Sequence, residues 1–200
     1  YELQSKFMPD GAKKPGEVKD VASYKPEHSW NYEAGIRSEL IKGRLSSELT
    51  LFYMDIRDIQ LTSFAENGSG RLITNGGKAN SYGVEVSLRS RIAEGLTADL
   101  NYGFTHASFR DYVFTDKNEQ GQIVETDCKD NYIPYTPRHT VSMGVQYTKL
   151  LHNKPIDQFT ASAQFTGAGK IFWTEKNDIS QPFYGLLNAK VGVRKGIVNL

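Results

Sequence analysis

The chain has 200 residues, enough for one domain with a hydrophobic core, and its 24 Lys and Arg against 23 Asp and Glu leave a formal net charge of +1. Because no basic block stands out, we do not expect nucleic acid as a partner. Hydrophobic residues make up 38%, with 11 Tyr and 10 Phe, which fits β structure with one wet face. No apolar run approaches the roughly 18 residues of a spanning helix, which excludes a helical membrane protein but not a membrane β-barrel.

Alternation of apolar and polar residues predicts about seven β-strands of roughly ten residues, each with one apolar and one polar face. In chain order, the apolar positions are Trp30, Tyr32, Ala34 and Ile36; Leu49, Leu51 and Tyr53; Tyr82, Val84, Val86 and Leu88; Leu96, Ala98, Leu100, Tyr102 and Phe104; Val141, Met143, Val145 and Tyr147; Phe159, Ala161, Ala163 and Phe165; and Leu187, Ala189, Val191 and Val193. No comparable helical period occurs. We therefore predict an all-β chain that forms an antiparallel meander, in which each strand pairs with its sequence neighbour.

The connections between these strands alternate in length. Short turns are predicted at residues 42–43, 93–95, 150–156 and 195–196, and long polar loops at about 57–77, 110–138 and 175–181. Tight turns at one end of a sheet and long loops at the other are typical of outer-membrane barrels. A soluble sandwich tolerates loops of mixed length at both ends, so this rhythm favours the barrel.

The polar faces of the strands carry charged residues at mid-strand, which need water of the kind that a wide barrel lumen supplies. They are Glu33, Arg37, Glu85, Arg89, Arg91, Asp99, Lys190 and Arg194. The opposite face is expected to meet lipid, at Val84, Val86, Leu88, Leu96, Leu100 and Phe104. The predicted fold is a transmembrane β-barrel meander, and the alternative is a soluble or surface all-β binding or adhesion module.

Aromatic residues gather near the strand ends on the apolar face. They are Trp30, Tyr32, Tyr53, Tyr82, Tyr102, Phe104 and Tyr147. Rings with an apolar body and a polar tip suit the girdles at lipid headgroups. For any single ring, ordinary sheet packing is the alternative.

Catalytic and metal chemistry find little support in the sequence. Cys128 has no second cysteine for a disulfide, and His28, His106, His139 and His152 lack a spacing that would place two on one metal. No nucleophile, base and orienting residue occur as a set. We expect no metal site, no cofactor and no enzymatic activity; an outer-membrane enzyme on a small barrel is therefore the weakest alternative.

Several different short motifs are distributed along the chain from about Tyr24 to Leu200. They include Tyr24-Lys25-Pro26-Glu27, Asn31-Tyr32-Glu33-Ala34-Gly35, Leu51-Phe52-Tyr53-Met54-Asp55-Ile56-Arg57-Asp58-Ile59-Gln60, Asn75-Gly76-Gly77-Lys78-Ala79 and Ile133-Pro134-Tyr135-Thr136-Pro137-Arg138-His139. In order and spacing this set resembles the late barrel of TonB-dependent outer-membrane receptors, and most of all the receptors for ferric siderophores. Pro26 and Pro137 each stand just before a predicted strand. Proline has no backbone N–H, so it ends hydrogen-bond pairing at that point.

The resemblance implies a barrel of about 22 strands with a plug in its lumen, of which this chain would supply roughly strands 14 to 20. The plug domain and the final strands would then lie outside residues 1–200. It also implies active, TonB-dependent uptake of an iron chelate, a ferric siderophore or similar, across the outer membrane of a Gram-negative bacterium. The implied partners are outer-membrane lipid, the plug domain of the same receptor, the TonB system and the iron chelate.

Within this interpretation, two groups of residues are candidates for function. Cations and aromatic faces of the long loops and strand lips would contact a charged chelate: Phe64, Arg71, Arg110, Tyr112, Phe114, Lys129, Tyr132, Phe172, Trp173 and Lys176. Polar residues at mid-strand would face the plug across the lumen: Glu33, Arg37, Glu85, Arg89, Arg91 and Asp99. For each loop residue singly, a solvated role without ligand contact is the alternative.

Overall fold

The computed structural model describes residues 26–64, 71–75, 77–117, 120, 122–151, 155–196 and 198–199. All secondary-structure elements in these residues are β-strands, so the predicted all-β class is confirmed. No helix long and apolar enough to span a membrane occurs in the same ranges. The start of the motif at Tyr24 and the middle of the predicted turn at 150–156 lie outside the described residues.

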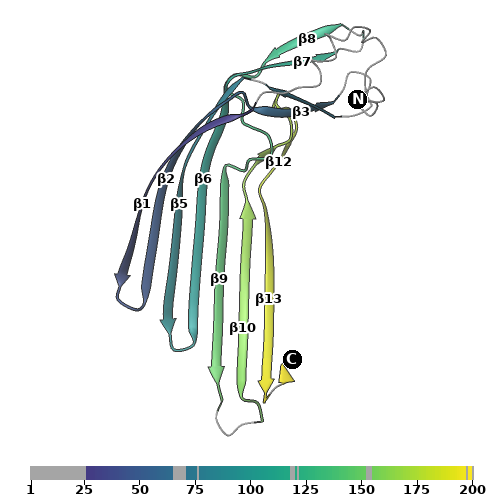
Figure 1. Cartoon of the computed structure of the whole chain (residues 1–200). Helices are drawn as coiled ribbons and strands as arrows, with labels where there is room; N and C mark the ends of the chain where they lie inside the picture. The colour runs from purple at the N-terminus through teal and green to yellow at the C-terminus, as the bar shows by residue number, and fades with distance from the viewer. Residues whose placement is uncertain are drawn as a thin grey trace, which may run out of the picture. The chain divides into compact units, whose positions relative to one another are not determined.

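Seven long strands and one two-residue strand form the main sheet (Figure 1). They are β1 (His28–Ile41), β2 (Leu45–Arg57), β5 (Lys78–Ala93), β6 (Leu96–Asp111), β9 (His139–Leu150), β10 (Gln158–Ala168), β13 (Tyr184–Lys195) and β14 (Val198–Asn199). Their order in the sheet is their order in the chain, and β6 to β9, β9 to β10, β10 to β13 and β13 to β14 pair antiparallel. The predicted meander is therefore confirmed for the long strands.

The long strands exceed the predicted length of roughly ten residues. β5 and β6 have 16 residues each, and even β10 has 11. At about 3.3 Å per residue, 16 residues reach roughly 50 Å, about twice the apolar band of a membrane barrel. The alternating pattern ends where one face stops being apolar, whereas backbone pairing continues beyond it.

Three short hairpins form separate two-stranded sheets. They are β3 (Gln60–Phe64) with β4 (Arg71–Asn75), β7 (Val113–Lys117) with β8 (Ile123–Asp127), and β11 (Ile171–Phe172) with β12 (Ser180–Gln181). The first two lie wholly inside segments predicted as long polar loops, and the third overlaps the last of them. These strands have five residues or fewer, too short for an alternating pattern to be recognised in the sequence.

The predicted short turns at 42–43 and 93–95 are confirmed, since turns occupy residues 42–44 and 94–95. Gly43 and Gly95 take φ angles of 65° and 74°, in the left-handed region that other residues seldom adopt. The amide of Arg44 donates to the carbonyl of Ile41 at 2.9 Å and closes the first turn. These tight turns fix the register of the strands that they join.

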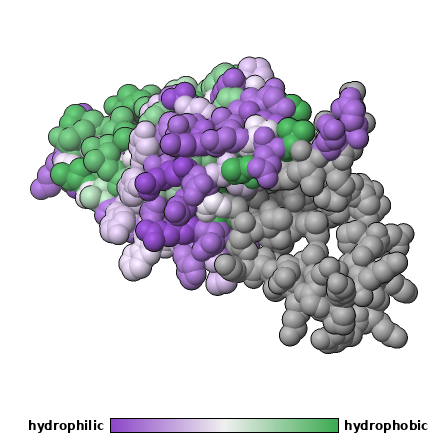
Figure 2. All heavy atoms as spheres, turned by 90° about the horizontal axis from the view of Figure 1, so that it is seen from above, coloured by the Kyte–Doolittle hydropathy of each residue, from purple (hydrophilic) through white to green (hydrophobic). Residues whose placement is uncertain are grey.

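Across β6, β9, β10 and β13 the register places apolar residues beside apolar residues and polar residues beside polar residues. Two rows of partners are apolar, Leu100–Met143–Phe165–Leu187 and Ala98–Val145–Ala163–Ala189, and the row between them is Asp99–Gly144–Gln164–Asn188. Since successive side chains of a strand point to opposite faces, these rows define an apolar face and a polar face of the sheet. Figure 2, seen along the long strands, shows hydrophobic and hydrophilic side chains gathered on different sides.

The apolar face has no covering layer among the described residues. Leu187 is 73% exposed and Met143 45%, and Trp30, Ile36 and Val191 are similarly open. Fully burying one such side chain stabilises a fold by about 1.5–3 kcal/mol, so an exposed apolar face of this extent would gain stability from an apolar environment.

The chain divides into two compact units. Unit 1 comprises residues 1–31, 54–80 and 108–131, and unit 2 comprises residues 32–53, 81–107 and 132–200. Unit 1 contains hairpins β3–β4 and β7–β8 and a small core, in which Phe109 and Cys128 are fully buried. Unit 2 contains the two-faced part of the sheet, with the rows of apolar and polar partners and hairpin β11–β12.

Candidate functional site

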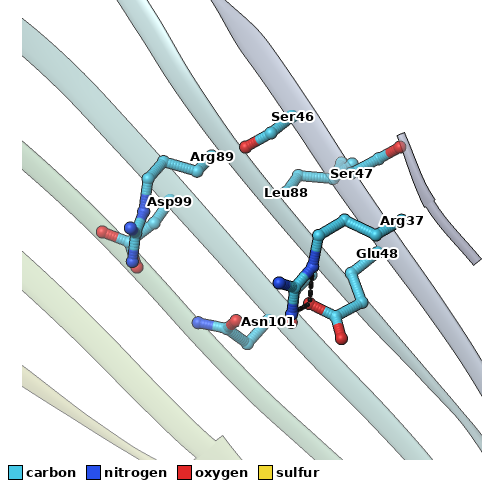
Figure 3. A pocket seen from close by; sticks show the side chains of 9 residues that line it. Arg37, Ser46, Ser47, Glu48, Leu88, Arg89, Asp99 and Asn101 are labelled. Atoms are coloured by element: carbon cyan, nitrogen blue, oxygen red, sulfur yellow. Dashed lines mark hydrogen bonds and ion pairs between the residues drawn. The ribbon is translucent and has the colours of Figure 1, made fainter. Parts of the chain in front are cut away.

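A polar groove of about 430 Å³ lies in unit 2 (Figure 3). Its lining side chains come from four adjacent strands of the sheet, β1, β2, β5 and β6. They are Arg37, Ser46, Ser47, Glu48, Ser87, Leu88, Arg89, Asp99 and Asn101. Most of these residues belong to the polar parity that the sequence assigns to a wet face, and the two-residue period of the strands brings them together.

Opposite charges meet within this polar groove. One carboxylate oxygen of Glu48 accepts from Nη2 of Arg37 at 2.8 Å and from its Nε at 3.1 Å. Figure 3 shows Arg89 and Asp99 directed toward one another. The carboxylate of Asp99 also lies over Gly144, where an added Cβ would stand 2.5 Å from Oδ1. An exposed ion pair such as Arg37–Glu48 contributes only about 0–1 kcal/mol, so a polar partner can replace it at small cost.

The structure brings three of the six predicted lumen residues, Arg37, Arg89 and Asp99, into the polar groove. Glu85 lines a neighbouring hollow of about 230 Å³. Glu33 and Arg91 are exposed but line neither hollow. Contact of all six residues with a plug stays a prediction.

A further hollow, of about 350 Å³, lies in unit 1 at hairpin β7–β8. It is lined by Arg110, Asp111, Val113, Glu125, Asp127 and Lys129. Two of the predicted ligand contacts, Arg110 and Lys129, thus share one hollow although 19 positions separate them in the sequence. Asp55, which does not line the hollow, accepts from Arg110 at 3.4 Å and from Arg57 at 3.1 Å.

Tyr112, another predicted ligand contact, is only 9% exposed and packs on Phe109 with ring centroids 4.7 Å apart. Its carbonyl accepts from the amide of Cys128 at 2.9 Å, which closes the base of hairpin β7–β8. The structure thus gives Tyr112 a packing position beside the hollow, and Phe114 lies half-buried in β7. Phe64 and Arg71 are opposite each other in hairpin β3–β4, but their side chains lie outside what the structure describes.

A third group, which we call the aromatic–cation cluster, lies in unit 2 and consists of Tyr82, His106, Tyr132, Phe172, Arg138 and Lys170. Its rings are in contact: centroids are 4.9 Å apart for Tyr82 and His106, 5.1 Å for His106 and Tyr132, and 5.5 Å for Tyr132 and Phe172, which are nearly parallel. The Arg138 guanidinium lies 5.0 Å from the Tyr132 centroid and the Lys170 ammonium 4.4 Å from that of Phe172. Such cation–π contacts contribute about 0.5–2 kcal/mol.

Loop contacts hold this cluster in place. The side chain of Asn177 accepts from the amide of Tyr132 at 2.7 Å and donates to its carbonyl at 2.9 Å. The amide of Tyr135 donates to the carbonyl of Phe172 at 2.9 Å. Trp173, a predicted ligand contact, meets Tyr135 edge-on at 5.5 Å, and Lys176 lies half-buried in the same loop.

The loop between β11 and β12 contains one carboxyl with a lowered pKa, that of Asp178. The hydroxyl of Thr174 donates to the side chain of Asp178, and this bond holds the pKa of Asp178 below its ordinary value of 3.8. Asp178 therefore stays charged down to acidic pH. The bond braces the turn that carries Asn177 against Tyr132.

Sequence reasoning named Tyr132, Phe172, Trp173 and Lys176 but missed His106, Arg138 and Lys170 as members of a site. The one sequence signal for His106 is its position, two residues beyond Phe104 and four beyond Tyr102 on the apolar parity. Arg138 and Lys170 gave no local signal, because the rings that they cover come from distant segments. Ligand contact by the named residues stays a prediction.

Among the residues that the structure describes, no group of three or more His, Cys, Asp or Glu side chains could hold a metal ion. Cys128 is fully buried, with its thiol 3.6 Å from the carbonyl of Thr126. The three groups instead offer fixed charges, aromatic faces and hydrogen-bonding groups, which can hold and release a partner without covalent chemistry.

Comparison with known proteins places this sheet in context. The sequence matches the family described as TonB dependent receptor-like, beta-barrel, over residues 8–198. The ferric-pyoverdine M114 receptor PbuA of Pseudomonas sp. (strain M114) is 26% identical over 192 residues, which are 94% of this chain and 21% of that receptor. The chain thus spans about a fifth of the length of this relative.

Two solved structures share the fold. The ferric yersiniabactin uptake receptor FyuA from Yersinia pestis matches with a TM-score of 0.63 and 23% identity, over 84% of this chain and 22% of that one. The siderophore receptor PiuA from Acinetobacter baumannii matches with a TM-score of 0.64 and 16% identity, over 87% and 23%. At these identities the likeness concerns the fold alone.

Proposed function

Because the chain belongs to the TonB-dependent receptor-like β-barrel family, we propose that it is part of the wall and outer loops of an outer-membrane receptor that takes up an iron chelate. The observation that carries the proposal is the two-faced sheet: the described residues leave its apolar face exposed, and its polar face carries the Arg37–Glu48 ion pair in a groove. Lipid on one side and a water-filled, plugged lumen on the other supply what each face needs. The alternative of a soluble binding module would need a second layer over the apolar face.

The cargo we propose is a ferric siderophore or a similar iron chelate, taken up with energy from the TonB system. In support, the matched relative is a receptor for ferric pyoverdine, and one of the matched structures takes up ferric yersiniabactin. Arg110 and Lys129 are the groups of the unit 1 hollow that would contact a negatively charged chelate, and Asp111, Glu125 and Asp127 line the same hollow. The part played by this chain is binding and passage, without catalysis.

The place in the barrel and the partners belong to the same proposal. The chain would supply roughly strands 14 to 20 of a barrel of about 22. Arg37 would exchange its contact with Glu48 for contacts with a plug domain when the plug moves, and Arg89 and Asp99 would offer further charges to the plug from the same groove. The host would be a Gram-negative bacterium, with the long loops on the outside of the cell.

The test uses the full-length receptor with Arg110→Ala and Lys129→Ala combined, titrated with a panel of ferric siderophores, hemin and cobalamin by quenching of tryptophan fluorescence. We expect one ferric siderophore class to bind, and the double variant to bind it at least tenfold more weakly, a loss of about 1.4 kcal/mol. Lys42→Ala with Lys149→Ala removes equal charge near the short turns and should leave binding unchanged. Binding of hemin or cobalamin alone would contradict the proposed cargo.

Uptake supplies the second arm of the test. Cells that express the receptor should accumulate iron from the bound chelate, and accumulation should stop in TonB-deficient cells while binding at the surface persists. Accumulation that is equal in both kinds of cell would contradict TonB dependence.

A further inference from the structure

The polar face of the main sheet has a charged part and an uncharged part, both in unit 2. On β1, β2 and β5 this face carries charges of both signs, among them Arg37, Glu48 and Glu85. On β9 and β10 the residues of the same parity, within 140–148 and 158–168, are only Ser, Thr, Gln, Gly and Ala. We call these residues of β9 and β10 the uncharged strip.

The register of β9 and β10 makes the strip continuous. Gln146 is paired with Ser162, and Ser142 with Thr166. Alternate residues of a strand point to the same face, so these pairs are successive steps of one surface. Figure 1 shows β9 and β10 side by side along their length. The strip therefore runs from the long-loop end of the two strands to their short-turn end.

Charged residues border the strip from the strands on either side. On β6, the carboxylate of Asp99 lies over Gly144, and Figure 3 shows it directed toward Arg89 in the polar groove. On β13, Lys190 is paired with Ser162 and is exposed. The strip is thus a neutral surface between the charged groove and a strand that carries a cation.

Two cations follow the strip at its long-loop end. The amide of Thr105 donates to the carbonyl of Arg138 at 2.9 Å, and the amide of Gly169 to that of His139 at 2.7 Å. This pairing continues the register, so Arg138 and Lys170 belong to the polar parity. Nε of Arg138 is buried without a hydrogen-bond partner. Neighbouring cations raise the local concentration of an anionic solute, here at one end of the strip.

Neutral and charged groups hold a moving solute differently. A hydrogen bond to a charged group contributes about 1.5–3 kcal/mol, against about 0.5–1.5 kcal/mol for a neutral pair. Carboxylates of the charged part would repel an anionic chelate and its guanidinium groups would retain it, whereas hydroxyls and amides exchange a solute for water at small cost. Passage through a pore needs contacts strong enough for entry and weak enough for release. Complementary charges instead fix the orientation of a partner that stays bound.

We propose that the uncharged strip is the surface along which the iron chelate passes through the lumen, while the plug keeps its contacts with the polar groove. This inference rests on the proposed function, a plugged barrel that takes up an anionic iron chelate. It adds the side of the lumen that opens: the chelate enters beside Arg138 and Lys170, moves along β9 and β10, and leaves near the short turns.

Cysteine labelling of the full-length receptor tests which wall borders the path. Ser162→Cys and Thr166→Cys place a thiol on the strip, and Ser46→Cys and Ser87→Cys place one in the polar groove. Cells that take up the ferric siderophore identified by the binding panel are treated with a membrane-impermeant sulfonated maleimide, and mass spectrometry measures the labelled fraction. The parent receptor, with its buried Cys128, gives the background.

We expect labelling of the two strip positions to be at least tenfold faster during uptake than in TonB-deficient cells. Labelling in the polar groove should differ less than twofold between the same cells, because the plug still covers it. Siderophore binding at the cell surface and resistance of the barrel to sodium dodecyl sulfate without heating check that each variant is intact.

Three outcomes would overturn the inference while leaving the proposed function in place: equal acceleration of labelling at both walls, acceleration in the polar groove alone, or no acceleration on the strip while uptake proceeds. A parent receptor that shows no TonB-dependent uptake would overturn the proposed function and this inference with it. Iron uptake, measured on the same cells, therefore separates the two failures.

Discussion

At the scale of single residues, glycines allow large side chains to lie across neighbouring strands on the polar face. An added Cβ at Gly83 would stand 2.6 Å from the ring of Phe52 and 2.1 Å from the carbonyl oxygen of Phe104. At Gly144 it would stand 2.5 Å from the carboxylate of Asp99. The ring of Phe52 and the carboxylate of Asp99 therefore depend on a neighbour without a side chain.

Gly83→Ala should lower the free energy of unfolding of the full-length receptor by about 1–3 kcal/mol, because the carbonyl of Phe104 belongs to the backbone and yields only if the strands shift. Urea unfolding in lipid vesicles measures the change. Ser87→Ala, on the same strand and the same parity, adds no volume and serves as the control. A Gly83→Ala receptor as stable as its parent would contradict the close approach.

Asp157 makes one short turn sensitive to acid. The amide of Gly196, donating at 2.7 Å, and the Lys195 ammonium, at 3.1 Å, hold the pKa of Asp157 below its ordinary value of 3.8. A carboxyl with a lowered pKa in the folded state supports the turn fully above about pH 3.8, and this support is lost as pH falls through the folded pKa. The stability of the turn should therefore fall only in strong acid.

Hydrogen exchange of the Gly196 amide tests this expectation. Its protection factor should be constant from pH 7 to pH 5 and should drop below pH 3.8. Asp157→Asn should give low protection at every pH, whereas Glu94→Gln, at another short turn, should change nothing. Protection that is independent of Asp157 would contradict the assigned hydrogen bond.

At the scale of elements, the two-residue period decides which face each residue joins. The sheet pairs Leu100 with Met143 and Asp99 with Gly144, as the alternation of each strand predicts when read alone. The faces could be predicted because a strand has only two, and a slip of one residue would exchange them all. The ends of the strands could not be predicted, because backbone hydrogen bonding continues beyond the last residues of the apolar–polar alternation.

Leu100→Arg should cost about 2–4 kcal/mol of unfolding free energy in a bilayer if the site lies at mid-membrane. Asn101→Arg, the next residue on the opposite face, should be nearly neutral, since that face carries the polar groove that Asn101 lines. The pair of variants differs by one position and one face. Equal costs for the two would contradict the assignment of lipid and lumen faces.

The candidate sites were only partly predictable for a related reason. Arg110 and Lys129 were named as loop cations, but their meeting depends on hairpin β7–β8, which lies between them in the sequence and was predicted as loop. The aromatic–cation cluster joins Tyr82, His106, Tyr132 and Phe172 from four separate segments. Contacts of that range depend on the register of the whole sheet, which a local pattern does not contain.

At the scale of the whole molecule, the described sheet is open and bare on its apolar side, and it spans about a fifth of the matched relatives. In the proposed barrel, lipid on the apolar face and neighbouring strands at the sheet edges would supply the contacts that stabilise it. A turn of two or three residues fixes the register of the strands that it joins, so its sequence can vary little. A hairpin within a long loop pairs with itself, so its sequence can vary without disturbing the main sheet.

Deletion of hairpin β7–β8 tests whether the long loops bind the ligand while the long strands determine folding and insertion. The amide of Cys128 donates to the carbonyl of Tyr112 at 2.9 Å, so the ends of residues 113–127 are already adjacent. Replacing 113–127 by two glycines keeps Tyr112, Phe109 and Cys128 in their small core but removes two walls of the hollow that contains Arg110 and Lys129. The shortened receptor should insert and fold as the parent does, yet bind its ferric siderophore at least tenfold more weakly. The matched variant replaces residues 151–156 by a glycine-rich turn at the other end of the strands, and it should bind normally. If the hairpin deletion inserts and binds unchanged while the turn variant loses binding, the assignment of the ligand side to the long loops is wrong.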